Sequence, residues 1–163
     1  HYRSWLKAAR LSRLLPQDEA AANRWLTRLK YSRSESQAIC RVLNTQAYVE
    51  RLVVQEGYLD RADEFFMFKS AGASFPAVSL VALSSGVPVE SVINLVKRYQ
   101  DADDAIAHPS PLVSGKDLMG TLGLKSGPHI GRLLSAIEQA QAQGIVTNAQ
   151  EALAWAQDWA DQP

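Results

Sequence analysis

Two aspartates in this sequence have a spacing that could support metal-dependent chemistry. Asp101 and Asp103 form an Asp-x-Asp pair, the spacing with which two carboxylates can hold Mg²⁺. They fall at the junction between an expected helix and a linker, with no expected strand before them. We therefore interpret them as solvated loop residues.

The histidines and the single cysteine give no better candidate for catalysis. His1, His108 and His129 are far apart and lack cysteine or acidic partners at metal-ligand spacing. Cys40 follows Ala38 and Ile39, a setting that favours an inert, buried thiol, and one cysteine cannot form an internal disulfide. We expect no catalytic residue, no metal site and no cofactor in this chain.

Basic residues at the start of the chain could bind an anionic partner. Residues 1–60 carry ten Lys and Arg against six Asp and Glu, although the whole chain has a net charge of zero. Arg3, Lys7 and Arg10 recur at helical spacing and continue in the basic residues Arg13, Arg24, Arg28 and Lys30. The alternative is that this stripe is only the solvated face of a core-packed helix.

A second basic group surrounds a turn in the segment 111–144. Its residues are Lys116, Lys125, Gly127, His129 and Arg132. Together with free N–H groups at a helix N-terminus they could contact the phosphates of a polyanion. Alternatively, they are solvated charges at helix ends.

The elements that position this second group are two helices and a tight turn. Ser114 and Asp117 form a capping box, and Gly123 ends the first helix. Gly127 is expected to take an unusual φ before Pro128 opens a long helix that Gly144 closes. Gly131 would then permit close approach of another helix or of a phosphate backbone.

The rest of the sequence is typical of an all-α protein. No stretch alternates apolar and polar residues long enough for a convincing sheet. Ser32 and Glu35 predict one long helix to about Val54, and residues 75–83 favour helix over a rival strand. Further helical signals are Trp25, Leu26 and Leu29 at helical spacing, and a capping box of Thr147 and Gln150 before a last helix with Trp155 and Trp159 on one face.

The composition predicts two parts. The linker 102–111 contains acidic residues and two prolines, so we divide the chain into a helical body, 1–104, and a smaller helical tail, 105–163. No apolar run approaches the length needed to cross a bilayer, and the start does not resemble a secretory signal. We expect a soluble, cytoplasmic protein.

The order of glycines in the tail resembles a known family. The pattern is Gly115-x-Asp117-Leu118, then Gly123-Leu124, then Gly127-Pro128-x-x-Gly131, and a long helix closed by Gly144. It resembles the C-terminal end of bacterial class II tRNA nucleotidyltransferases and their poly(A) polymerase relatives. The resemblance is strongest over residues 111–160 and looser upstream.

This resemblance implies a body and tail that hold tRNA, or another RNA 3′ end, by shape and phosphate contacts. A separate catalytic head of the same protein would add A, CC or CCA, or poly(A), from ATP or CTP with Mg²⁺. That head would carry a Gly-Ser before two metal-binding aspartates on strands, and this sequence does not contain it. We expect a part of a longer enzyme that has no activity alone.

Two other functions fit some of the residues. Residues 114–143 could be a DNA-binding helix-turn-helix, although Arg132 is the only basic residue on the outward side of its second helix. Alternatively, Trp5, Trp155 and Trp159 could form an exposed apolar patch on a protein-docking module.

Overall fold

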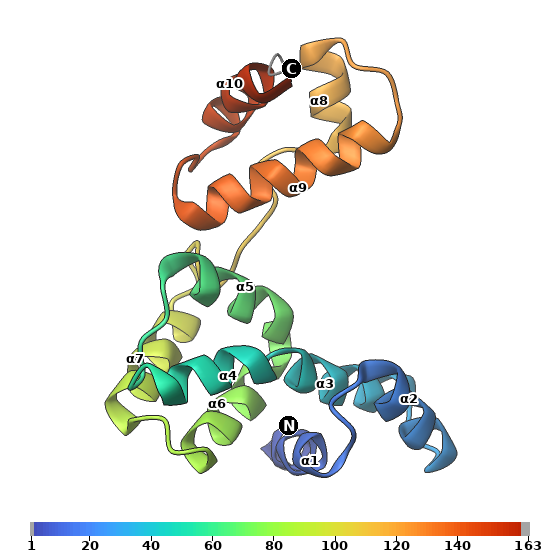
Figure 1. The fold of residues 1–163 in the computed structure, drawn as a ribbon, viewed down its shortest axis with the longest axis vertical. Helices are drawn as coiled ribbons and strands as arrows, with labels where there is room; N and C mark the ends of the chain where they lie inside the picture. Colours follow the sequence, from blue (N-terminus) through green and yellow to red (C-terminus); the bar gives the residue numbers. More distant parts are fainter. Residues whose placement is uncertain (1, 161–163) are drawn as a thin grey trace. The chain divides into compact units, whose positions relative to one another are not determined.

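The computed structural model describes residues 2–160 of the chain and the side chains of residues 4–159. The described residues form helices without a strand, which confirms the all-α prediction (Figure 1). In chain order the elements are α1 (Tyr2–Leu14), α2 (Glu19–Arg28), α3 (Arg33–Asn44), α4 (Gln46–Val54), α5 (Arg61–Ala71), the 3₁₀ helix η1 (Gly72–Ser74), α6 (Phe75–Ser84), α7 (Val89–Gln100), α8 (Gly115–Leu122), α9 (Pro128–Gln143) and α10 (Ala149–Ala160).

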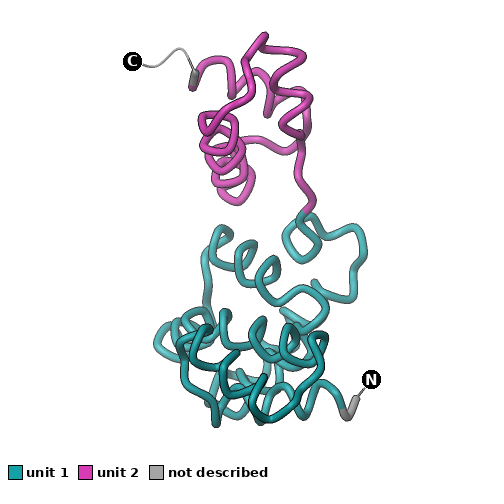
Figure 2. The backbone as a smooth tube through the Cα atoms, turned by 90° about the vertical axis from the view of Figure 1, so that its right-hand side faces the viewer, with its two compact units in different colours: residues 1–109 teal, residues 110–163 magenta. Residues whose placement is uncertain are grey.

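The chain divides into two compact units, which we call the N-terminal unit (1–109) and the C-terminal unit (110–163) (Figure 2). The sequence-based boundary lies five residues earlier, after residue 104. Residues 105–109 belong to the N-terminal unit, where Ile106 and Ala107 are buried. Their backbone N–H groups donate to Asp104 Oδ1 at 2.8 and 2.9 Å, which fixes the start of the connecting segment.

The N-terminal unit is organised around α3 and α6. Helices α1, α2 and α5 pack against α3, while α6 packs against α1, α4 and α7. Phe65, Phe68 and Phe75 are buried, and the ring centroids of Phe68 and Phe75 lie 4.8 Å apart, as do those of Phe75 and Tyr99. These aromatic contacts join α5, α6 and α7.

The apolar run after Gly72 is the helix α6, as predicted, and not a strand. Pro76 lies in its first turn, where a missing N–H leaves no helical hydrogen bond unmade. The helix is apolar on all sides because it is the central element of the unit. Its buried residues are Phe75, Ala77, Val78, Ser79, Val81 and Ala82.

One helical stretch is longer and more apolar than the sequence suggested. Arg61–Ser84, which comprises α5, η1 and α6, could cross a membrane by length and composition. Of its most apolar window, 56% is buried inside the protein. Burial of this kind is typical of a core helix, and Gly72 with φ 46° separates its two α-helices.

The segment 32–54 is two helices, whereas the sequence predicted one. The capping box of Ser32 and Glu35 is confirmed. Helix α3 nevertheless ends before the buried Thr45, whose backbone N–H and hydroxyl both donate to the Val42 carbonyl, at 3.2 and 2.8 Å. Because this threonine satisfies its polar groups locally, the regular helical hydrogen bonding is interrupted and α4 begins at Gln46.

The C-terminal unit packs α8, α9 and α10 around its own core. Gly123 (φ 64°) and Gly144 (φ 80°) end α8 and α9 in the left-handed conformation that glycine adopts without strain. The core consists of Val113, Leu118, Ile130, Leu133, Ile137, Ala140, Val146, Ala152 and Ala156, with Trp155 packed at its edge.

The start of α10 differs from the predicted capping box. The carboxylate of Glu151, rather than the side chain of Gln150, accepts hydrogen bonds from the N–H and hydroxyl of Thr147 at 2.7 and 2.9 Å. Asn148 Oδ1 accepts from the Glu151 N–H at 3.0 Å and caps the helix. The cap is therefore one residue later than the sequence pattern indicated.

Candidate nucleic-acid interface

The predicted capping box is confirmed at the N-terminus of α8, the helix that precedes the turn to α9. The Ser114 N–H donates to Asp117 Oδ2 at 2.7 Å, and the Asp117 N–H donates to Ser114 Oγ at 3.3 Å. Hydrogen bonds from the Ser114 hydroxyl and backbone lower the pKa of Asp117, which therefore stays ionised at neutral pH. A carboxylate at this position also stabilises the N-terminus of α8.

The close approach between these helices occurs at Gly115, not at Gly131 as the sequence suggested. A Cβ on Gly115 would lie 3.2 Å from Ile130 Cγ2 and 3.9 Å from Leu134 Cδ1. Nothing lies within 4 Å of the corresponding position on Gly131. The first turn of α8 thus packs on the first half of α9, and Gly131 leaves a bare exposed surface.

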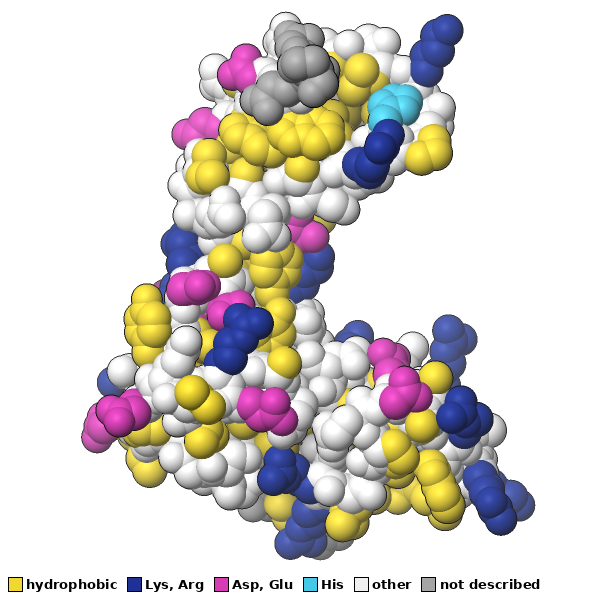
Figure 3. Space-filling view, in the orientation of Figure 1, with side chains coloured by type: hydrophobic (Ala, Val, Ile, Leu, Met, Phe, Trp, Pro, Cys, Tyr) yellow, Lys and Arg dark blue, Asp and Glu magenta, His cyan; other side chains and the backbone are white. Residues whose placement is uncertain are grey.

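This packing places the start of α8, where Lys116 lies, against the first half of α9, where His129 and Arg132 lie. Lys116 follows Gly115 at the α8–α9 contact, Lys125 lies in the connecting turn, and His129 and Arg132 lie in the first turns of α9. Lys116, Lys125 and Arg132 are exposed, and none of them forms an ion pair with another residue that the structure describes. Figure 3 shows Lys and Arg side chains on either side of a histidine in the C-terminal unit.

Gly127 has an ordinary extended backbone, with φ 171° and ψ 177°, and not the unusual φ expected from the sequence. Its role is spatial, since a Cβ there would meet His129 Nδ1 at 3.0 Å. The glycine leaves room for the half-buried imidazole to lie against the turn.

The N-terminus of α9 has no side-chain cap. Pro128 occupies the first turn, and no side chain accepts a hydrogen bond from the N–H groups there. The Ile130 N–H donates to the Gly127 carbonyl at 3.1 Å. An uncapped N-terminus carries a partial positive charge that adds to the cations around it.

The predicted basic stripe on α1 is only partly available to a ligand. Lys7 Nζ donates to Glu35 Oε1 at 2.5 Å and lies 5.0 Å from the centroid of the Tyr31 ring. The Glu35 hydrogen bond raises the pKa of Lys7, and the Lys7 and Ser32 hydrogen bonds lower that of Glu35 to about 2. Arg10 is exposed without an ion pair among the described residues, and the Arg3 side chain lies outside them.

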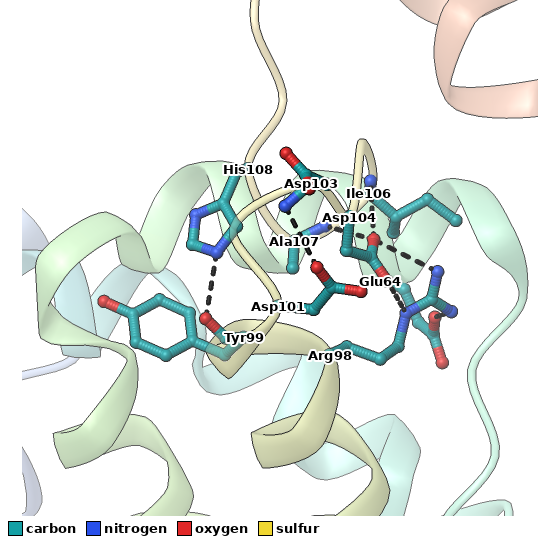
Figure 4. A network of polar contacts seen from close by, with 9 residues as sticks. All are labelled: Glu64, Arg98, Tyr99, Asp101, Asp103, Asp104, Ile106, Ala107 and His108. Atoms are coloured by element: carbon teal, nitrogen blue, oxygen red, sulfur yellow. Dashed lines mark hydrogen bonds and ion pairs between the residues drawn. The ribbon is translucent and has the colours of Figure 1, made fainter.

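A network at the end of the N-terminal unit uses acidic residues that the sequence assigned to a solvated linker (Figure 4). Arg98 Nη1 donates to Glu64 Oε2 at 2.7 Å, and Arg98 Nε donates to Asp104 Oδ2 at 2.9 Å. His108 Nε2 lies 2.9 Å from the Tyr99 carbonyl. These contacts attach the segment after α7 to α5 and α7.

The pKa values of the two carboxylates that contact Arg98 are shifted in opposite directions. Burial is the largest effect on Glu64 and raises its pKa despite Arg98. Burial also opposes ionisation of Asp104, but hydrogen bonds from Arg98 and the N–H groups of Ala107 and Ile106 outweigh it and lower the pKa. The Asp101 carboxylate accepts the Asp103 N–H at 3.0 Å, which is the geometry of a loop and not of a shared metal site.

A groove of about 560 Å³ in the C-terminal unit does not suit a polyanion. It lies between residues 111–114 and α9 and is largely apolar. Its charged lining residues, Asp117 and Glu138, are acidic, and it contains none of the predicted RNA-binding cations.

The tryptophans differ from the arrangement that a docking patch would need. Trp5 is half-buried in the N-terminal unit, and Trp155 packs against the core of the C-terminal unit. Trp159 is 39% exposed. The most exposed tryptophan in the described part of the chain is Trp25, with an exposed fraction of 49%. Of the three residues that the sequence placed at helical spacing, Trp25, Leu26 and Leu29, only Leu26 is buried.

The chain is similar to known tRNA nucleotidyltransferases. The family model for tRNA nucleotidyltransferase domain 2 matches residues 4–156. The chain is 36% identical over 153 residues to a CC-adding tRNA nucleotidyltransferase of Synechocystis, covering 92% of this chain and 36% of that enzyme. No solved structure matches the chain significantly.

Two further relatives match shorter stretches. The chain is 48% identical over 56 residues to an A-adding tRNA nucleotidyltransferase of Deinococcus radiodurans, covering 34% of this chain and 13% of that enzyme. It is 40% identical over 62 residues to a CC-adding tRNA nucleotidyltransferase of Thermus thermophilus, covering 38% and 14% respectively. The chain therefore spans at most about a third of each relative.

Proposed function

Since the chain belongs to the tRNA nucleotidyltransferase family, we propose that it is the part of such an enzyme that holds tRNA by its shape and phosphates. The observation that supports this most is the region around the α8–α9 turn. There Lys116, Lys125 and Arg132 are exposed without acidic partners beside an uncapped helix N-terminus.

Phosphate binding explains why this region combines cations with free backbone N–H groups. Like charges that lie close together repel one another in the absence of an anion. Phosphate oxygens accept hydrogen bonds from both kinds of donor, so the turn fits a sugar–phosphate backbone. On the N-terminal unit, Arg10 would extend the contact surface, whereas Lys7 is already engaged by Glu35.

The proposal assigns the chemistry to the remainder of a longer protein. The chain spans 36% of the Synechocystis relative, and we propose that a separate catalytic head, using Mg²⁺ with ATP or CTP, belongs to the remainder of such an enzyme. The residues of this chain bind and orient RNA so that its 3′ end reaches that head. Such a protein would act in the cytoplasm, on tRNA.

A salt titration of tRNA binding tests the proposal. We expect the chain to bind tRNA with an affinity that falls steeply with salt, because phosphate contacts release counterions. The double variant K125Q/R132Q should weaken tRNA binding by about tenfold, while the matched variant K97Q, on exposed Lys97 of α7, should not change it.

Two results would contradict the proposal. Equal binding of duplex DNA and tRNA, both weakened by K125Q/R132Q, would favour the helix-turn-helix alternative. Absence of salt-dependent binding to any nucleic acid would leave a protein-docking module. Circular dichroism of each variant would establish that the substitutions do not unfold the unit.

A further inference from the structure

A second surface, on the N-terminal unit, combines exposed apolar side chains with unpaired cations. Helices α1 and α2 both pack on α3 but scarcely on each other. Pro16 follows the end of α1, and Asp18 caps α2 by accepting the Ala21 N–H at 2.7 Å, so the chain turns sharply between them. The gap is a groove of about 600 Å³ lined by Leu11, Leu14, Leu15, Pro16, Trp25 and Leu29.

The groove exposes large apolar side chains that a folded unit ordinarily buries. Leu14 is 80% exposed, Leu29 is 54% exposed and Trp25 is 49% exposed. Their position at the edges of one groove, rather than scattered singly, indicates a surface that binds something. The volume lies in the usual range for small-ligand sites.

The charges around the groove select an anionic ligand. Four basic residues of α1, α2 and the following turn form no ion pair with any described residue: Arg10, Arg24, Arg28 and Lys30. Two carboxylates lie nearby without an ion pair to these cations: Asp18 caps α2, and Glu19 accepts a hydrogen bond from Asn44 Nδ2 at 3.1 Å. A ligand with planar apolar rings and phosphates would contact both the exposed apolar side chains and the unpaired cations. An apolar protein segment would match only the former, and an acidic segment only the latter.

We propose that this groove binds an unpaired RNA nucleotide, with its base stacked on Trp25 and its phosphates near Arg10, Arg24 and Arg28. The Arg28 guanidinium lies 5.8 Å from the Trp25 ring centroid, so an aromatic surface and a phosphate donor are adjacent. Paired RNA hides the faces of its bases, whereas loops and ends can present them for stacking. The inference rests on the proposed RNA-holding function and adds a class of RNA element that it contacts.

The test uses the full chain with hexa-adenylate and a paired RNA duplex of equal charge as probes, followed by fluorescence anisotropy. We expect W25L to weaken hexa-adenylate binding by about tenfold, because it removes the stacking surface but keeps an apolar side chain. W25F should restore most of the affinity. Y58L, which removes the 66% exposed Tyr58 elsewhere on the unit, should have no effect.

A second variant tests the charges and protects against a folding artefact. R24Q/R28Q should weaken binding of both probes. It should also make the affinity for hexa-adenylate less dependent on salt: the slope of the logarithm of the binding constant against the logarithm of the salt concentration should become shallower by about 0.7 for each phosphate that the variant no longer neutralises. W25L should leave duplex binding unchanged. Thermal unfolding of each variant should match that of the parent chain.

The outcomes separate this inference from the proposed function. If hexa-adenylate does not bind, or binds W25L and the parent equally, the groove inference is wrong even where K125Q/R132Q weakens tRNA binding. If W25L weakens hexa-adenylate binding but K125Q/R132Q leaves tRNA binding unchanged, the groove inference stands and the proposed contact at the α8–α9 turn fails.

Discussion

The guanidinium of Arg98 is shared by two carboxylates that lie far apart in sequence. Its own side chain is 34% exposed, while those of Glu64 and Asp104 are 19% and 16% exposed. Without the cation, Glu64 would stay largely removed from water without its ion pair, and Asp104 would keep only the N–H groups of Ile106 and Ala107 as partners. Arg98 therefore has a structural role in joining α5, α7 and the segment after α7.

We predict that R98Q lowers the free energy of unfolding by about 2 kcal/mol, because glutamine leaves a partly buried carboxylate poorly paired. Urea denaturation at neutral pH measures this. The control is K97Q, the neighbouring exposed residue on α7, for which we expect a change below about 0.5 kcal/mol. Equal stability of the R98Q variant and the parent would mean that the network contributes nothing to stability.

The Lys7–Glu35 pair predicts a dependence of stability on acid pH. Hydrogen bonds from Lys7 and Ser32 lower the pKa of Glu35 from 4.5 to about 2 in the folded chain. The contribution of the Glu35 charge to the free energy of unfolding is therefore complete above about pH 4.5 and is lost as the pH falls toward about 2. E35Q keeps an amide that can complete the capping box but removes the charge.

We expect E35Q to have a lower melting temperature than the parent at pH 6, and the difference to disappear near pH 2. Circular dichroism melts at several pH values measure it. The matched variant E50Q, on an exposed glutamate of α4, should show no such convergence. A difference that persists unchanged at pH 2 would exclude the charge of Glu35 as its cause.

Among individual residues, the sequence predicted the contacts whose partners are close in the chain. The capping pairs Ser32–Glu35 and Ser114–Asp117 are confirmed because each closes a hydrogen-bonded loop within three residues. Lys7 and Glu35 are 28 residues apart, so only the packing of α1 on α3 brings them together. The sequence therefore indicated Lys7 as a free cation, although it is paired.

At the scale of helices, the glycines of α8 and α9 have opposite roles. A methyl group on Gly115 would press on Ile130, which is buried and cannot move away easily. A methyl group on Gly131 would meet nothing within 4 Å and would favour the helix. The sequence left close approach of a helix or of a phosphate backbone open at Gly131, because spacing alone does not show which face of a helix meets its partner.

We predict that G115A destabilises the chain by about 1 kcal/mol through overpacking, whereas G131A stabilises it by about 0.5–1 kcal/mol through helix propensity. Urea denaturation of the two variants forms a matched pair, since each adds one methyl group within the same two helices. The packing argument is wrong if G115A is the more stable of the two.

The types of the helices were predictable, but the break between α3 and α4 was not. The neighbouring helical segments and Pro76 favoured helix over strand for residues 75–83, and the structure confirms it. The break at Thr45 depends on which backbone carbonyl accepts the hydrogen bond of the buried Thr45 hydroxyl. The packing of the surrounding core determines this acceptor, and sequence spacing does not reveal that packing.

For the whole molecule, the family resemblance came from the glycine pattern of the C-terminal unit, and the family model extends it over residues 4–156. The relatives are named for adding CC and for adding A, yet this chain is similar to both kinds. We infer that the region serves a purpose that the two activities share, as holding a common RNA would. The groove beside Trp25 was not predictable, because helical spacing does not distinguish a core-facing tryptophan from an exposed one.

If both units hold one tRNA molecule, charge removal from the two should act together. R24Q/R28Q and K125Q/R132Q lie in different units without shared partners, so we predict that the losses in binding free energy add in the fourfold variant. Each phosphate of paired RNA that is no longer neutralised should also reduce the salt slope by about 0.9. Isothermal titration with tRNA at several salt concentrations measures both quantities. If the fourfold variant binds tRNA with the same affinity as whichever double variant has the lower affinity, one of the two surfaces does not contact tRNA.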